Sequence, residues 1–354
     1  MASYEKRGTK WTVRFRLDGQ KRLSGFDTKK DAEQAYVKAL AVNNQSTTAL
    51  TLQNLFELYK NYKRLKVKES SYISFMQTLE TYVLPYFAKT KLDNLTTNKI
   101  AEWQGIINAL PIKFKTKDKI YVTFVNLINY AISFHGLPFN PVSKVGNFKN
   151  TEIAEPMDFW TETEFEQFIA VIDDLLYKTL FATLYLTGIR KGELIALNWQ
   201  DINLAQNTIS ITKTYTRKVL GGGYALTSPK SKSSNRIVLI PQTLANLLKR
   251  LQDEQCQQVG YTKKCFVFGF SRPLPTSNID HQKRRYCTLS GVKPIRIHDF
   301  RHSHASLLIN KGHSALLVAQ RLGHSDINMT LNTYSHLFPN KEQEFINSMN
   351  ITID

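Results

Sequence analysis

The strongest constraint on this chain lies in its last quarter. The run HDFRHSHASLLINKGHSALLVAQRLGHSDINMTLNTYSHLF, from His298 to Phe338, places several histidines, an arginine and a tyrosine within a short alternation of helices and caps. His298 and Arg301 are three residues apart, so on a helix their side chains project from the same face. Polar groups that share a face, or stand at a helix end, can converge on one ligand.

Two glycines in the same run mark predicted helix ends. Gly312 and Gly323 each follow an apolar helical stretch, which predicts that each lies at the end of a helix. His324 comes directly after the second glycine. Ser325 is then placed to cap a final helix that carries Tyr334.

Two upstream fragments complete the set of polar residues. The segment TGIRKGELIALNWQDI (187–202) carries Arg190 and Glu193 three residues apart, and TSPKSKSSNRIVLIP (227–241) indicates a hairpin with Lys230 near its tip. The chain shows no obvious pair of carboxylates for general acid–base work and no glycine-rich phosphate loop. Arginines, a lysine, histidines and a tyrosine suit a phosphodiester, which needs cations for its oxygens, proton-transfer groups and a hydroxyl nucleophile.

The histidine-rich motif HDFRHSH is not expected to hold a metal. His298 and His302 would need a third ligand close by, and no Cys or Asp has a suitable spacing. We therefore expect no metal and no cofactor. His302 and His304 are expected to have structural or supporting roles.

The overall charge points to a polyanionic partner. The 354 residues include 47 Lys and Arg against 29 Asp and Glu, a formal net charge of +18. The sequence contains no stretch of about 18 apolar residues, so no membrane span is expected. The first residues lack the apolar core of a signal peptide. A cytoplasmic protein is expected. The three cysteines form no C-x-x-C pair and are expected to be free thiols.

Residues 1–46 are predicted to form a small domain of three short strands and one helix. The segment KWTVRFRL (10–17) alternates strictly between apolar and polar residues, as in a half-buried strand. Arg14 and Arg16 fall on its polar face and are candidates for DNA contact. The alternative is an edge sheet whose charges only discourage aggregation.

The rest of the chain is predicted to form two further domains. Residues 51–145 have helical patterns throughout, and Asn140-Pro141 is expected to end this all-helical domain. Residues 155–354 are expected to be mainly helical with a small antiparallel sheet, so the fold class is multidomain α+β. Candidate phosphate contacts in the helical domain, each of which could instead be merely solvated, are Arg64, Lys66, Lys113 and Lys115.

Taken in order, these motifs resemble the tyrosine recombinase (phage integrase) family. The matching pieces are TGIRKGEL, SPKSKSSNR, HDFRH, LGHSD and NTYSH. The resemblance implies an arm-type DNA-binding domain at the N-terminus, a core-binding (SAM-like) domain and a catalytic domain. It implies the catalytic residues Arg190, Lys230, His298, Arg301, His324 and Tyr334, with Glu193 orienting or balancing Arg190.

The resemblance also implies a mechanism and partners. Tyr334 would attack a DNA phosphate and form a 3′-phosphotyrosyl intermediate without metal or ATP, and Lys230 would protonate the leaving 5′-oxygen. The expected function is integration and excision of a phage or conjugative element at attachment sites in double-stranded DNA. A homo-tetramer on DNA is expected, with an excisionase and a host DNA-bending protein as further partners.

Several alternatives stay open at this point. Lys232 lies two residues from Lys230 and could take its role, although Lys230 matches the family's first lysine in this hairpin. Tyr286 is a weak rival to Tyr334. The chain could also have only the activity of a type IB-like topoisomerase, or act as a DNA-binding accessory regulator.

Overall fold

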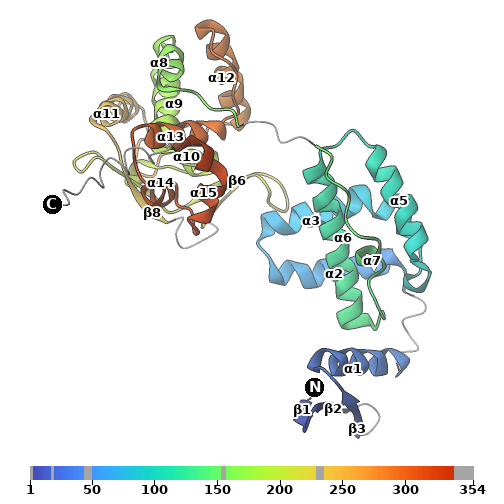
Figure 1. Ribbon diagram of the computed structural model, residues 1–354. Coiled ribbons are helices and arrows are strands. Elements are labelled where there is room, and N and C mark those ends of the chain that lie inside the picture. Colours follow the sequence, from blue (N-terminus) through green and yellow to red (C-terminus); the bar gives the residue numbers. More distant parts are fainter. Residues whose placement is uncertain (1–2, 17–19, 44–49, 153–156, 229–234, 339–354) are drawn as a thin grey trace, which may run out of the picture. The chain divides into compact units, whose positions relative to one another are not determined.

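A computed structural model describes residues 3–16, 20–43, 50–152, 157–228 and 235–338. The chain divides into two compact units, one of Met1–Ala154 with Lys218–Gly221 and one of Glu155–Arg217 with Gly222–Asp354. Figure 1 shows the elements of both units. The three predicted domains, residues 1–46, 51–145 and 155–354, stay predictions.

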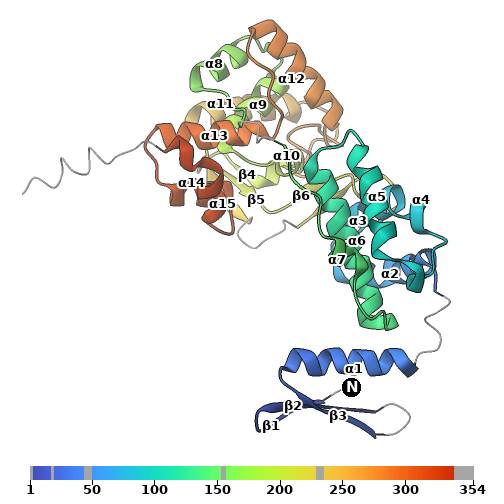
Figure 2. The ribbon, with the colours of Figure 1, turned by 45° about the vertical axis from the view of Figure 1, so that its right-hand side comes forward.

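The first unit begins with a three-stranded antiparallel sheet and a helix. The strands are β1 (Ser3–Arg7), β2 (Lys10–Arg16) and β3 (Gln20–Phe26), with β2 in the centre. Helix α1 (Lys29–Asn43) packs against β2 and β3, as Figure 2 shows. The apolar alternation of β2 predicts this packing, because Val13 and Phe15 face the helix and are buried with Ala32.

The remainder of this unit contains only helices among its described residues. They are α2 (Leu52–Lys66), α3 (Glu69–Tyr82), α4 (Leu84–Phe87), the 3₁₀-helix η2 (Leu92–Asn94), α5 (Thr97–Ala109), α6 (Phe114–His135) and α7 (Pro141–Val145). The prediction that Asn140-Pro141 ends the domain is wrong. The Asn140 side chain caps α7, and Val142 and Phe148 are buried in the same core as Trp103.

The second unit is mainly helical with small antiparallel sheets, which confirms the predicted class. Its helices are α8 (Glu162–Ala170), α9 (Leu175–Thr187), α10 (Lys191–Ile195), η3 (Trp199–Asp201), α11 (Gln242–Cys256), α12 (Thr276–Ser290), α13 (Asp299–Asn310), α14 (Ala315–Leu322), α15 (Asn328–Tyr334) and η5 (Ser335–Leu337). The Thr-x-x-Glu spacing of Thr161 and Glu164 predicts a capping box, and the two residues form one at the start of α8.

The strands of the second unit form two separate sheets. Strands β4 (Ile202–Asn203), β5 (Thr208–Ile211) and β8 (Arg236–Leu239) make one, and β6 (Thr214–Thr216) and β7 (Ala225–Thr227) make a hairpin. Val238 faces the core, whereas its neighbours Ile237 and Leu239 are exposed. The β6–β7 hairpin was not predicted. Lys230 and Lys232, between β7 and β8, lie outside the described residues.

Helix α9 is the centre of this unit, where it packs against α11 and α13. The apolar segment 174–190 predicts a buried amphipathic helix, and α9 is buried on nearly all sides. Two of its buried threonines, Thr183 and Thr187, are accommodated because their hydroxyls donate to backbone carbonyls one turn earlier. None of the helices described in either unit is long and apolar enough to cross a membrane.

Candidate active site

The end of α9 sets the position of Arg190. Gly188 ends the helix at φ +64, and a Cβ there would lie 2.6 Å from the His304 ring and 2.8 Å from the Leu322 side chain. Only glycine fits this turn without strain. The chain then enters α10, where the backbone N–H and Nη1 of Arg190 both donate to the Glu193 carboxylate at 2.9 Å.

Glu193 also binds a second arginine, Arg236 on β8. The Arg236 guanidinium donates to both Glu193 oxygens, at 3.3 and 3.0 Å, and its Nε donates to the Arg321 carbonyl at 3.0 Å. Both side chains are buried, at 2% exposed for Glu193 and 8% for Arg236. Burial alone would raise the pKa of Glu193, but Arg236 and then Arg190 hold that pKa below its usual value. Glu193 is therefore a buried anion shared by two arginines.

Arg301 brings a further guanidinium from α13. The residue is 4% exposed, and its Nη1 donates to the Gly188 carbonyl at 3.0 Å. Its Nη2 is buried and has no hydrogen-bond partner among the described residues. Burial and then the nearby Arg190 charge lower the pKa of Arg301 to about 9. A buried donor without a partner is costly, so this group is arranged to receive an anion.

Two predicted histidines lie near these arginines. His324 follows Gly323, which ends α14 at φ +70, and its Nδ1 lies 2.7 Å from Thr330 Oγ1. Burial and the charge of Arg301 lower the pKa of His324 to about 4. His298 stands directly before α13, and although its surface is exposed, partial desolvation and Arg301 lower its pKa. Both histidines are neutral at pH 7 and can donate and accept a hydrogen bond.

Tyr334, at the end of α15, is 1% exposed. Its hydroxyl lies 2.7 Å from Nδ1 of His302, on the facing helix α13. Burial raises the pKa of Tyr334 to about 12, and burial together with His298 lowers the pKa of His302 to about 4. The phenol is therefore the hydrogen-bond donor, and the neutral imidazole accepts through Nδ1 in the tautomer protonated at Nε2.

Sequence reasoning missed the positions of His302 and Arg236. The HDFRH motif gives His302 no partner, and nothing in the order of residues joins Arg236 to Glu193. His304, by contrast, links α13 to α9 and α14. Its Nδ1 lies 2.7 Å from the Tyr185 carbonyl, and Arg321 Nε donates to its Nε2 at 2.9 Å.

One cap near the site was predicted wrongly. Ser325 does not cap the last helix, because α15 begins at Asn328 and the Asp326 side chain accepts from the Asn328 backbone N–H at 2.9 Å. Across the described ranges, no group of three His, Cys, Asp or Glu could hold a metal ion.

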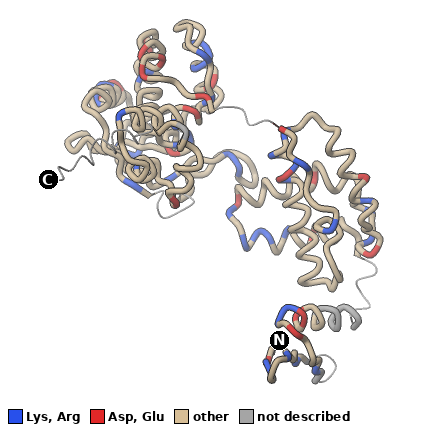
Figure 3. Tube along the Cα trace, in the orientation of Figure 1, with Lys and Arg blue, Asp and Glu red and all other residues tan. Residues whose placement is uncertain are grey.

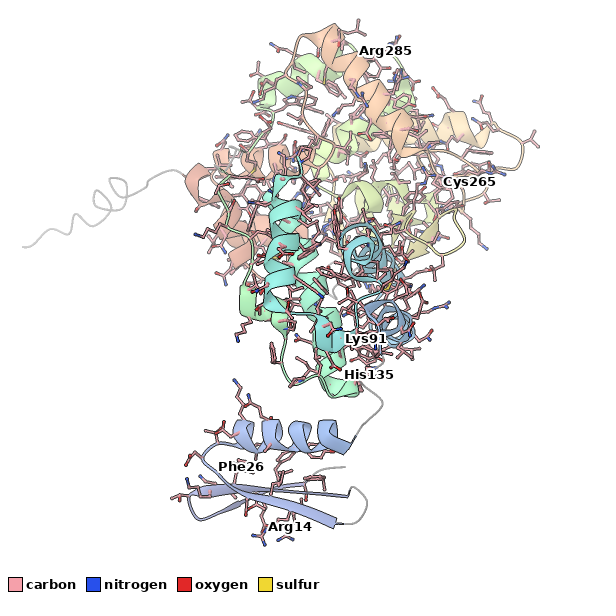
Figure 4. All side chains as sticks on the ribbon, turned by 90° about the vertical axis from the view of Figure 1, so that its right-hand side faces the viewer. Arg14, Phe26, Lys91, His135, Cys265 and Arg285 are labelled. Atoms are coloured by element: carbon pink, nitrogen blue, oxygen red, sulfur yellow. The ribbon has the colours of Figure 1, made fainter. Side chains whose placement is uncertain are left out.

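The predicted DNA-contacting residues lie apart from this site in sequence. Arg14 is exposed, pairs with Glu5 at 3.2 Å and points away from α1 in Figure 4. Arg16 ends β2, and its side chain is outside the described part. Lys and Arg gather where α2 ends in Figure 3. The exposed candidates in the helical part are Arg64, Lys66, Lys113 and Lys115.

Known proteins resemble this chain over most of its length. Residues 158–341 match the model of the phage integrase family, and residues 51–107 match the phage integrase N-terminal SAM-like domain. The ICEBs1 integrase of Bacillus subtilis (strain 168) is 30% identical over 313 residues, which are 86% of this chain and 84% of that protein. The integrase of Staphylococcus phage L54a is 26% identical over 334 residues, 86% of this chain and 94% of its own.

Solved structures show the same fold. The Tn1549 transposon integrase, in complex with transposon right end DNA, superposes with a TM-score of 0.69 at 20% identity, covering 85% of this chain and all of that one. A lambda integrase dimer bound to a COC′ core site gives a TM-score of 0.59 at 17% identity, covering 99% of this chain and 97% of that one. With its family model, its integrase relatives and its fold in agreement, this chain belongs to the phage integrase family and is a tyrosine site-specific recombinase.

Proposed function

We propose that Arg190, Arg301 and His324 bind the scissile phosphate of a DNA strand and that Tyr334 attacks it. The observation that carries this proposal is the buried, unpartnered Nη2 of Arg301 beside Arg190. Two guanidinium groups match the non-bridging oxygens of a phosphodiester and stabilise the added charge of the transition state. Neutral His324 donates a further hydrogen bond to the same phosphate.

The proposed step forms one bond and breaks one. The Tyr334 oxygen attacks phosphorus, and the bond from phosphorus to the 5′-oxygen breaks. The tyrosine proton passes to a base, and the 5′-oxygen takes a proton from Lys230, a role that rests on the family resemblance and leaves Lys232 open. The 3′-phosphotyrosyl link keeps the bond energy, so a 5′-hydroxyl from a partner strand can reverse the step without ATP or a metal.

We assign the tyrosine proton to His302 in place of His298, the residue that the motif suggests. The 2.7 Å contact from its Nδ1 to the Tyr334 hydroxyl is within reach for general base catalysis. His298, whose ring centroid lies 5.2 Å from that of His302, then orients the phosphate. Because Tyr334 is 1% exposed, attack also requires a shift of the short helix α15.

Glu193 orients Arg190 in this proposal. Its two oxygens hold the backbone and Nη1 of Arg190 on one side and Arg236 on the other. A carboxylate that accepts this many hydrogen bonds keeps its charge. Because Glu193 already fixes the Arg190 side chain, Arg190 loses less conformational freedom when it binds phosphate.

The two N-terminal modules bind the duplex outside the catalytic site. Arg14 is exposed on the face of β2 that is turned from α1, which suits a sheet placed in a major groove, and the strict alternation of the sequence predicts the same face for Arg16. Lys113 and Lys115 stand at the N-terminus of α6, where the helix dipole adds to their positive charge. These lysines, with Arg64 and Lys66, suit phosphates and position the protein without reading sequence.

The substrate is a pair of attachment sites in double-stranded DNA that join a phage or conjugative element to its host chromosome. The ICEBs1 and L54a relatives support this assignment. Lambda integrase has been solved as a tetramer bound to a Holliday junction, which supports a homo-tetramer here. An excisionase and a host DNA-bending protein assist, and the reaction takes place on the nucleoid in the host cytoplasm.

Strand exchange separates this function from its rivals. A supercoiled plasmid with two attachment sites is expected to recombine with wild type, and plasmids with one site or none are expected to stay unchanged. Relaxation of plasmids without sites would instead indicate a type IB-like topoisomerase. DNA binding without either product would indicate an accessory regulator and would overturn the proposal.

A further inference from the structure

A second group of cations surrounds a cavity of about 350 Å³ beside His298. It is lined by Lys191, Asp280, Lys283, Arg284, Arg296, Ile297 and His298. Four of these side chains are cationic and one is a carboxylate. A cavity of this size is within the range of ligand sites, and its mainly cationic lining favours an anion.

The cations of this cavity are fixed to different degrees. Lys283 is 8% exposed, and its ammonium donates to the Ile295 carbonyl. Arg296 is held through Nε by Asp299, at 3.0 and 3.2 Å. Arg284 is exposed and forms no ion pair within the described part of the chain. The site thus combines anchored positive charge with one guanidinium that can reorient toward an anion.

The carboxylate does not neutralise the cavity. Asp280 lies 3.8 Å from Lys191, at the limit of an ion pair, and both side chains are more than a third exposed. Such pairs contribute little and leave the charge accessible. Of the three further cations, Arg296 pairs with Asp299, which leaves Lys283 and Arg284 without an ion pair in the described part of the chain, so the cavity has a net positive charge.

A neighbouring cavity offers a contrast on the same helix. It has a volume of about 310 Å³ and is lined by Asp173, Asp174, Gln282, Arg285 and Tyr286. Arg284 and Arg285 are therefore consecutive on α12 but face opposite electrostatic environments. Figure 4 labels Arg285 near the end of α12. Two acids beside one arginine do not favour an anion.

The lining residues connect the first cavity to the proposed catalytic site. Lys191 directly follows Arg190, and His298 belongs to both groups. A DNA strand carries one phosphate per about 3.4 Å of rise, so a protein that binds one phosphate meets its neighbours within a short distance. A ligand of regularly spaced anions suits two adjacent positive sites.

We propose that this cavity binds a backbone phosphate of the duplex next to the phosphate held by Arg190 and Arg301. This inference rests on the proposed catalytic site. Arg284 and Lys283 bind the non-bridging oxygens, and Lys191 and Arg296 close the sides. The contact fixes the strand on both sides of His298, so that the scissile phosphate stays in place when Tyr334 attacks.

The test compares Arg284→Gln with the matched control Arg285→Gln. Binding is measured on duplexes in which single phosphates on either side of the cleavage position are replaced by neutral methylphosphonates. For wild type, a methylphosphonate at one of these positions is expected to weaken binding about tenfold, which corresponds to the loss of one charge-assisted hydrogen bond. Arg284→Gln is expected to bind unmodified DNA more weakly by about the same factor. A methylphosphonate at that position is then expected to weaken its binding no further.

A salt titration supplies an independent readout. Arg284→Gln is expected to reduce the slope of log affinity against log salt by about 1, as for one lost phosphate contact. Arg285→Gln is expected to leave both slope and affinity unchanged. Equal unfolding temperatures of the two variants would show that folding is not the cause.

Three results would overturn this inference. The first is an unchanged affinity of Arg284→Gln for DNA. The second is an equal loss of affinity in Arg284→Gln and Arg285→Gln. The third is a loss in Arg284→Gln that adds to the loss caused by the methylphosphonate at every position tested. Inorganic phosphate could instead stabilise the wild-type protein and not Arg284→Gln, with no methylphosphonate position coupled to Arg284. That result would assign the cavity to free phosphate. Formation of the Tyr334 adduct by wild type in parallel shows whether the catalytic proposal itself holds.

Discussion

The hydroxyl of Tyr334 lies 2.7 Å from Nδ1 of His302, a histidine one position beyond the arginine of the HDFR motif. The two residues are 32 positions apart in the chain and meet because α15 folds back toward α13. Burial keeps the phenol protonated and the imidazole neutral, since the pKa of Tyr334 is about 12 and that of His302 about 4. The pair is thus prepared for transfer of the phenolic proton to the imidazole.

Replacing His302 by Leu is expected to slow formation of the tyrosyl adduct about 100-fold, the lower range for loss of a general base. His302→Asn keeps an acceptor near the Nδ1 position and is expected to retain more activity. Single-turnover cleavage of a nicked duplex, measured from pH 6 to 9, provides the rates. A pH profile identical to wild type, with only stability changed, would refute a role in proton transfer.

Arg236 is expected to act as a positioning residue through Glu193. Arg236→Met leaves the buried carboxylate with Arg190 as its one remaining arginine, at a cost of about 3 kcal/mol in the free energy of unfolding. Adding Glu193→Gln should recover part of this loss, because the two residues are coupled. Urea unfolding of both single variants and the double variant measures the coupling. Additive losses would contradict it.

The turn at Gly188 offers a matched pair of glycine substitutions. Gly188→Ala adds a Cβ within 2.6 Å of His304 at a positive φ, so we expect a loss of about 3 kcal/mol from strain and overpacking. Gly312 also has a positive φ, +81, but a Cβ there has no heavy atom within 4 Å. Gly312→Ala is expected to cost about 1 kcal/mol. Similar losses in urea unfolding would show that contact with His304 is not the cause.

Acid is expected to destabilise the fold through its buried histidines. The pKa values of His302 and His324 are lowered to about 4 and that of His304 to about 3, against an ordinary value of 6.5. Between pH 6.5 and about 4 the unfolded chain binds more protons than the folded chain, so stability falls as pH falls.

The urea midpoint should therefore be constant above pH 7 and decrease from pH 6.5 to 5. His302→Asn should show a shallower decrease, because one of the histidines is removed. A midpoint that rises on acidification would contradict this assignment of neutral histidines.

Local spacing predicted some of the contacts between neighbouring residues, whereas the set of catalytic residues was implied by the family resemblance. Arg190 with Glu193, and Gly323 before His324, are separated by so few residues that helix geometry alone determines their relations. The alternation in β2 and the capping box at Thr161 were predicted for the same reason.

Contacts between distant elements could not be predicted in this way. Arg236 and Glu193 are 43 residues apart, and their pairing depends on a tertiary fold that brings the start of β8 within reach of Glu193. The β6–β7 hairpin had a signal in its three glycines, Gly221 to Gly223, all at positive φ.

Tyr334 is expected to form a covalent bond to DNA without a metal. The direct measurement incubates a labelled, nicked attachment-site duplex with wild type and with Tyr334→Phe, in the presence of EDTA, and resolves the products on a denaturing gel. A protein-linked strand is expected with wild type alone, and peptide mapping should locate the link at Tyr334. An adduct with both proteins, or none with wild type despite tight binding of the duplex, would contradict it.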